Sequence, residues 1–141
     1  MPEFPSTGEV EIPDGELLYR RIYPDPGHLV PLEDGTGYRP RSGALRSPEP
    51  LSVDRSSLST PEETRDRDTY RAFHVAAIAA GVARSCGCGV RPDPDEGNPA
   101  HALITGAHRD GKGGLSNGQA EKLARRSKII LLNATSSATD I

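Results

Sequence analysis

The apolar residues of this chain gather in short blocks separated by long stretches rich in proline and glycine. Leu, Ile, Val and Phe number 27 of 141 residues, about 19%, which is close to the level at which disorder becomes a real prospect. The formal net charge of −3 argues against a wholly disordered chain, because such chains usually carry a high net charge. The core must therefore be thin and built from the apolar blocks LLYRRI (17–22), LSV (51–53), FHVAAIAAGVA (73–83), HALI (101–104) and KIILL (128–132).

The length fits one domain with polar ends. We predict a flexible N-terminal arm over 1–15, a single α+β domain over 16–132 and a flexible C-terminal tail over 133–141. Strand-like and helix-like segments do not alternate regularly, which argues against a doubly wound sheet. The expected fold is a small mixed or antiparallel sheet of four to six strands, with two or three helices and long irregular loops.

Hydrophobic alternation and helix-capping residues predict the positions of the main strands and helices. Strands are expected in the first block, where Arg20 shares one face with Leu18 and Ile22 while Arg21 lies on the other face. Further strands are expected at 51–54, 100–105 and 128–132. Capping signals predict two helix starts, one at Thr60 with Glu63 three positions later and one at Ser116 with Gln119.

Two stretches are harder to interpret. Residues 73–86 fit either a buried strand followed by a helical turn or one buried helix, because periodicity does not separate short apolar runs. We favour strand and then helix. Residues 24–50 contain six prolines and four glycines, and this composition predicts a long loop with a short extended piece near 28–32.

Composition excludes several classes of function. Arginine outnumbers lysine 14 to 3, but the arginines are dispersed and the net charge is negative. This pattern indicates GC-rich, bacterial coding and argues against a nucleic-acid partner. No stretch approaches the about 20 apolar residues of a membrane span, and the first residues lack the basic start and apolar run of a signal peptide. We therefore expect a soluble cytoplasmic protein without a membrane partner.

Two motifs could hold ligands. Cys86, Cys88, His101 and His108 are zinc-ligand types, but one residue between the cysteines is too few for a usual structural site. We expect reduced thiols, with no metal and no cofactor. The glycine-rich segment 106–114 precedes a helix start, where anions can bind, but it lacks the phosphate-loop pattern and is interpreted as a surface loop.

The most informative pattern is charge inside predicted strands. Arg20 and Asp54 occupy strand positions where a charge must be paired or lie in a cleft, and Asp54 is a reasonable partner for Arg20. Arg41 and Ser42 can anchor the 24–50 loop, and His101 opens a strand after Asn-Pro. We predict that Arg20, Arg41, Ser42, Asp54 and His101 converge on one concave surface.

Two hypotheses for the function remain open, and whether the protein is an enzyme is undecided. The first is a small intracellular interaction or accessory module that binds another protein through its polar ends, because no nucleophile–base–acid set stands at a recognisable spacing. The second is a protein that handles a nucleotide or NAD. Residues 17–55, with arginine in a first strand, a serine-containing loop and a second strand, resemble the opening of ADP-ribosyltransferases and related NAD-cleaving toxins.

That resemblance implies that an early arginine holds the dinucleotide and that a later glutamate acts on the nicotinamide ribose. It also implies a role associated with toxins or defence. No glutamate occurs in or just before the closing block 128–132, and the nearest, Glu121, lies in a predicted helix. The resemblance therefore implies binding more strongly than catalysis.

Overall fold

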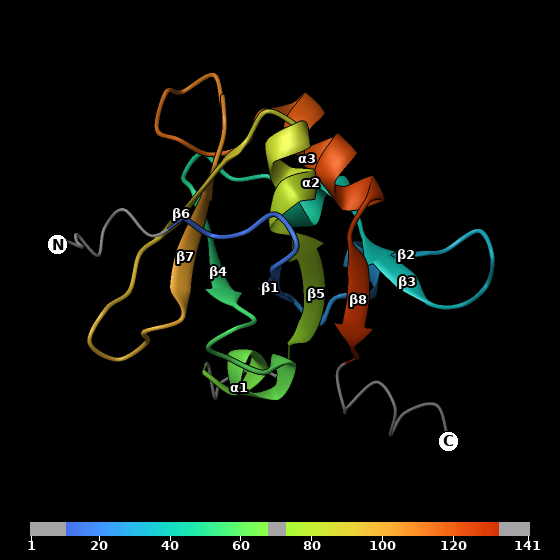
Figure 1. The fold of residues 1–141 in the computed structure, drawn as a ribbon. Helices are drawn as coiled ribbons and strands as arrows, with labels where there is room; N and C mark the ends of the chain where they lie inside the picture. Colours follow the sequence, from blue (N-terminus) through green and yellow to red (C-terminus); the bar gives the residue numbers. More distant parts are fainter. Residues whose placement is uncertain (1–10, 68–72, 133–141) are drawn as a thin grey trace, which may run out of the picture.

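A six-stranded antiparallel sheet forms the centre of the protein (Figure 1). The computed structural model describes residues 11–67 and 73–132. The strands run in the order β6-β7-β4-β1-β5-β8, and every neighbouring pair is antiparallel. Their bounds are β1 Leu17–Ile22, β4 Leu51–Arg55, β5 His74–Ala79, β6 Gly89–Pro92, β7 His101–Thr105 and β8 Lys128–Leu131. The predicted α+β class with a small sheet is confirmed.

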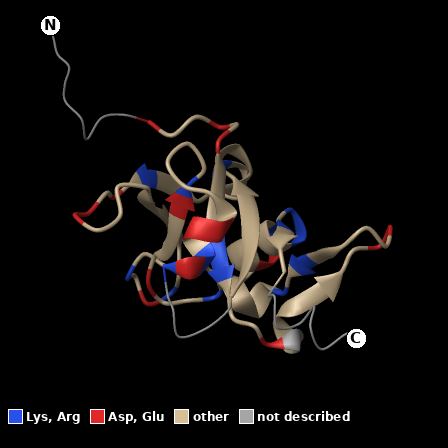
Figure 2. Cartoon of the chain, turned by 90° about the horizontal axis from the view of Figure 1, so that it is seen from below, with Lys and Arg blue, Asp and Glu red and all other residues tan. Residues whose placement is uncertain are grey.

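Three α-helices accompany the sheet in the described ranges, namely α1 (Pro61–Asp66), α2 (Ala80–Ser85) and α3 (Asn117–Arg125). Figure 1 shows α2 and α3 together at one end of the sheet and α1 at the opposite end. No helix of the described part is long and apolar enough to cross a membrane. Figure 2 shows acidic and basic segments interspersed on the side viewed, without a face of one sign.

Both predicted helix starts are confirmed by their capping hydrogen bonds. At α1, the Glu63 amide donates to Thr60 Oγ1 at 3.1 Å, and the Thr60 amide donates to Glu63 Oε1 at 3.0 Å. At α3, the Gln119 amide donates to Ser116 Oγ at 3.1 Å, and the Ser116 amide donates to Gln119 Oε1 at 3.0 Å. Each pair satisfies two amides that have no partner within the helix, so the local sequence alone fixes where these helices begin.

The apolar stretch that begins at residue 73 is a strand followed by a helix, as favoured from the sequence. β5 lies between β1 and β8, and Val75, Ala76 and Ile78 are fully buried there. The chain then turns into α2, where Ala80 and Ala83 are also fully buried. The segment is a strand and not the start of one long helix because, as β5, it forms hydrogen bonds with a neighbouring strand on each side.

The predicted long loop at 24–50 contains more regular structure than expected. β2 (Leu29–Pro31) corresponds to the extended piece near 28–32 and pairs with β3 (Tyr38–Pro40) in a separate two-stranded sheet. Two 3-10 helices, η2 (Pro26–His28) and η3 (Ser42–Leu45), flank this hairpin. The prolines therefore end short elements and do not prevent them, and the extended piece expected near 28–32 is one strand of this hairpin.

The core lies on one face of the main sheet, between the strands and helices α2 and α3. Its largest fully buried members are Ile12, Leu18, Ile22, Leu45, Leu51, Ile78, Ile104, Leu115 and Leu123. Residues 11–15 belong to the predicted flexible arm, yet Ile12 is buried and its carbonyl accepts a hydrogen bond from Arg84 at 2.6 Å. Contact with the domain thus begins before residue 16. Residues 1–10 and the predicted tail 133–141 lie outside the described residues.

Two glycines near the start of α3 provide a matched test of this packing. Gly114 is buried, and a Cβ there would overlap the Ser47 carbonyl oxygen and lie 2.6 Å from the carbonyl carbon of Pro48. Gly118 lies within α3, and nothing approaches its Cβ position within 4 Å. We expect Gly114→Ala to lower the free energy of unfolding by about 2 kcal/mol or more, through overpacking against backbone.

Gly118→Ala should instead raise the free energy of unfolding by about 0.5–1 kcal/mol, because alanine loses less backbone entropy on entering a helix. Urea denaturation of the two variants and the wild type measures both effects. Equal stability of the two variants would contradict the close approach of the Gly114 backbone to residues 47–48.

Candidate anion-binding site

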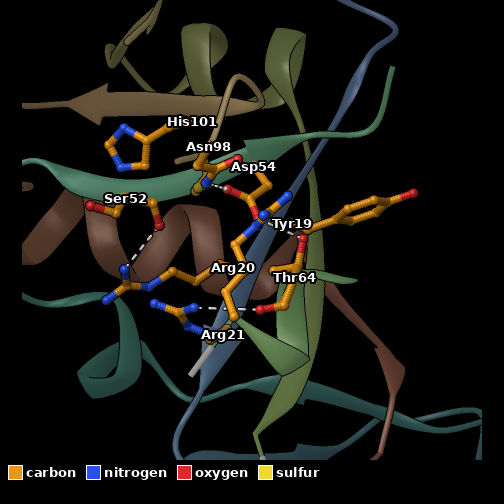
Figure 3. A pocket seen from close by; sticks show the side chains of 10 residues that line it. Tyr19, Arg20, Arg21, Ser52, Asp54, Thr64, Asn98 and His101 are labelled. Carbon is orange, nitrogen blue, oxygen red and sulfur yellow. Dashed lines mark hydrogen bonds and ion pairs between the residues drawn. The ribbon is translucent and has the colours of Figure 1, made fainter. Parts of the chain in front are cut away.

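The main sheet opens between β1 and β4. β1 pairs with β5 along its whole length, whereas β1 and β4 pair only at Leu18–Arg55 and Tyr19–Asp54. Beyond these pairs lies a pocket of about 270 Å³, lined by three consecutive residues of each strand: Tyr19, Arg20 and Arg21, and Ser52, Val53 and Asp54. Consecutive strand residues face opposite sides of a sheet. The pocket therefore occupies the opening between the two strands (Figure 3).

The rest of the wall comes from two other parts of the chain. Thr64 lies in α1 and Arg67 directly follows it, while Asn98 and His101 come from the β6–β7 connection and the start of β7. β7 pairs with β4, and Asp54 is opposite His101 in that register. The pocket is thus assembled from four separate segments of the chain.

Asp54 fixes three of these segments to one another. Its Oδ2 accepts hydrogen bonds from Arg67 Nε at 2.6 Å and from Thr64 Oγ1 at 2.8 Å. Its Oδ1 accepts from Asn98 Nδ2 at 2.8 Å. Burial alone would raise the pKa of the Asp54 carboxyl, but the hydrogen bonds from Arg67, Asn98 and Thr64 outweigh that effect and hold the pKa below its usual value.

Arg20 has no carboxylate partner among the described residues. Its NH1 donates to the Ser52 carbonyl oxygen at 3.0 Å, so the side chain replaces a hydrogen bond that a continuous β1–β4 ladder would have supplied. Its Nε is buried without a partner in the described part of the chain. Burial, and then the charge of Arg21, lower the pKa of Arg20. Arginine nevertheless remains protonated in proteins, so the pocket contains a half-buried cation whose Nε is fully buried.

Arg21 adds a second positive charge at the same pocket. Its NH1 donates a long hydrogen bond to the Thr64 carbonyl oxygen at 3.4 Å, and its guanidinium lies 5.4 Å from the centre of the Phe73 ring. No carboxylate within the described ranges pairs with it. Arg67 differs, because Asp54 neutralises it. The pocket therefore carries two uncompensated positive charges from described side chains.

His101 is oriented by a carboxylate on the far side of its ring. Its Nδ1 lies 3.0 Å from both the carbonyl oxygen and Oδ2 of Asp93. The side chain is 20% exposed. Figure 3 shows the opposite edge of the ring turned toward Ser52 and the Arg20 guanidinium. Since both Asp93 atoms accept hydrogen bonds, Nδ1 carries the proton and Nε2 is the nitrogen available to the pocket.

The five residues predicted to converge do so only in part. Arg20, Asp54 and His101 line the pocket, whereas Arg41 and Ser42 do not. Arg41 Nε donates to the Gly27 carbonyl oxygen at 2.7 Å, and Ser42 begins η3, which packs against α3. These two residues anchor the 24–50 segment elsewhere. The suggested Arg20–Asp54 pair is also wrong, because Arg67 occupies the Asp54 carboxylate.

Sequence reasoning left seven wall residues out of its predicted site, namely Tyr19, Arg21, Ser52, Val53, Thr64, Arg67 and Asn98. A signal existed for Asn98, which directly precedes the proline before His101. No local pattern indicates that α1 returns to the end of β4.

The other sequence candidates give weaker sites. Burial, with a smaller contribution from Cys86, raises the pKa of the Cys88 thiol to about 11, and both cysteines are free. Over residues 11–67 and 73–132, no three His, Cys, Asp or Glu side chains are placed to hold a metal. A second hollow of about 440 Å³ lies beside the glycine-rich loop, but its arginines, Arg46 and Arg109, are exposed.

Comparison with known proteins identifies no similar protein. No family model matches the chain, and neither a curated protein nor a solved structure matches it.

The role of Asp54 predicts a pH-dependent loss of stability. Asp54→Asn should lower the free energy of unfolding at pH 7 by roughly 3 kcal/mol, because it leaves Arg67 without its buried partner. A carboxyl whose folded-state pKa is lowered stabilises the fold above its unfolded pKa of about 3.9, and that contribution is lost as the pH falls through the folded-state value.

The difference between wild type and Asp54→Asn should therefore be largest near neutrality and shrink below about pH 4. Denaturation over this range measures it. Asp66→Asn is the control, since Asp66 is an exposed partner of Arg65 and should cost under about 1 kcal/mol. A pH-independent difference for Asp54→Asn would contradict the assigned role.

Proposed function

We propose that this protein binds a small, phosphate-bearing anion in the pocket between β1 and β4. The observation that carries the proposal is the half-buried Arg20 side chain in the opening of the sheet, whose Nε is buried and unpartnered and which has no carboxylate partner among the described residues. Burying an unpaired cation is unfavourable for folding. A protein that tolerates this arrangement gains from it when an anion enters.

Phosphate suits the donors of this pocket. Guanidinium groups form paired hydrogen bonds with phosphate oxygens, and two of them face this pocket. A volume of about 270 Å³ lies near the lower end of small-molecule sites. It suits a phosphate with part of the group attached to it.

The proposal agrees with one half of the ADP-ribosyltransferase resemblance, in which an arginine of the first strand holds a dinucleotide. The other half lacks support, since the closing strand β8, Lys128–Leu131, carries no glutamate. We therefore propose ligand binding without NAD cleavage. The hypothesis of a protein-interaction module stays a prediction.

Replacing Arg20 tests the proposal. We expect the wild type to bind inorganic phosphate, pyrophosphate, AMP or ADP-ribose in calorimetric titrations. Arg20→Met should weaken that binding by about 10- to 100-fold, the effect of losing hydrogen bonds to a charged group. Its free energy of unfolding should not fall, because methionine fills similar space without a buried charge.

Arg109→Met is the matched control, because Arg109 is exposed beside the second hollow. Its binding constants should equal those of the wild type. Binding that survives Arg20→Met and disappears in Arg109→Met would place the ligand in the second hollow, beside the glycine-rich loop, and refute the proposal. A loss of stability of about 3 kcal/mol in Arg20→Met would assign Arg20 a structural role instead.

A further inference from the structure

We infer that the ligand of this pocket carries a terminal phosphate monoester and that His101 takes up a proton to donate a hydrogen bond to it. This inference rests on the proposed function and makes it more specific. It concerns the charge of the ligand and the one pocket residue that can change its own charge near neutral pH.

The charge of the pocket matches a dianion. Arg20 and Arg21 contribute two positive charges, while the third arginine, Arg67, is neutralised by Asp54. A phosphate monoester carries about −1.5 to −2 charges at pH 7, whereas a phosphodiester carries one. A diester would therefore leave one of the two half-buried guanidinium charges uncompensated. The arginines favour the terminal phosphate of a monoester on electrostatic grounds.

His101 is placed to contact the same phosphate. Asp54 is opposite His101 in the β4–β7 register, so Ser52, two residues earlier in β4, lies on the same face of the sheet as His101. Arg20 donates to the carbonyl oxygen of that same Ser52. Figure 3 shows the free edge of the imidazole turned toward Ser52 and Arg20. Arg20 reaches the opening from the core face of β1 and His101 lines it from the other face, so a phosphate in the opening can contact both Arg20 and His101 Nε2.

The tautomer of His101 makes this contact depend on protonation. The two Asp93 oxygens only accept hydrogen bonds, so the proton of the neutral ring is on Nδ1 and Nε2 presents a lone pair to the pocket. The oxygens of a dianionic phosphate also only accept, and two acceptors repel. Uptake of one proton at Nε2 converts this repulsion into a charge-assisted hydrogen bond. The Asp93 carboxylate, 3.0 Å away, stabilises the imidazolium that forms.

The charged groups around His101 include more arginines than carboxylates before the ligand arrives. The charged groups on the segments around it are Asp93 after β6, Arg91 in β6, Asp54 in β4, Arg67 after α1, and Arg20 and Arg21 in β1. A bound dianion screens the arginines and adds its own attraction. Proton uptake should therefore accompany binding of the ligand.

Calorimetry in buffers of different ionisation enthalpy measures proton uptake directly. At pH 8 we expect AMP to bind the wild type with uptake approaching one proton per ligand, and His101→Gln to bind without uptake and about tenfold or more weakly. The methyl ester of AMP, a diester with one negative charge, should bind the wild type at least about tenfold more weakly than AMP. Asp93→Asn should reduce the uptake without abolishing binding.

Nitrogen NMR of the wild-type imidazole is a readout that does not depend on any variant folding. On addition of inorganic phosphate, the His101 Nε2 resonance should move from a lone-pair to a protonated position. Binding of AMP without proton uptake, or equal affinity for AMP and its methyl ester, would overturn the inference and leave the anion pocket in place. Absence of binding by every phosphate probe, or unchanged binding in Arg20→Met, overturns the proposed function and this inference with it.

Discussion

The carboxylate of Asp54 is the interaction on which the rest of this structure most depends. It accepts hydrogen bonds from Arg67 and Thr64 on the α1 side and from Asn98 on the β6–β7 side, and all three distances are at or below 2.8 Å. Without it, α1 and the loop before β7 would each meet the end of the sheet through few polar contacts. The apolar core is thin and contributes little to holding these segments in place. The hydrogen bonds of the Asp54 carboxylate therefore provide part of that stabilisation.

The same carboxylate determines which arginine is available to a ligand. Asp54 is paired with Arg67 at 2.6 Å and does not pair with Arg20, which approaches the pocket from the neighbouring strand. The pocket thus contains a neutral pair that builds the wall and two cations that retain their charge. Binding sites commonly combine charged side chains that are paired within the protein with others that have no partner until the ligand binds. The unpaired side chains lower the stability of the unliganded protein.

The features predicted correctly from the sequence are those determined by residues close together in the chain. The capping boxes at Thr60 and Ser116 specify helix starts through hydrogen bonds within four residues, and the first apolar block gives β1 the bounds observed. The pocket depends instead on register and on returns of the chain over long separations. Arg67 and Asp54 are 13 residues apart and Asn98 and Asp54 are 44 apart, and no periodicity encodes either contact. Arg41 was misplaced for the same reason, since its partner Gly27 is decided by the pairing of β2 with β3.

The opening of the sheet and the position of Arg20 have a common origin in the alternation of β1. Leu18 and Ile22 point into the core, and Arg20 lies between them on the same face. If β1 and β4 paired along their full length, this guanidinium would lie among the apolar core residues with no polar partner, at a cost of several kcal/mol. Separation of the strands after Tyr19 lets the side chain reach the Ser52 carbonyl and the edge of the solvent. The charge in the middle of a core-facing strand therefore accounts both for the break in the β1–β4 ladder and for a cationic pocket at that break.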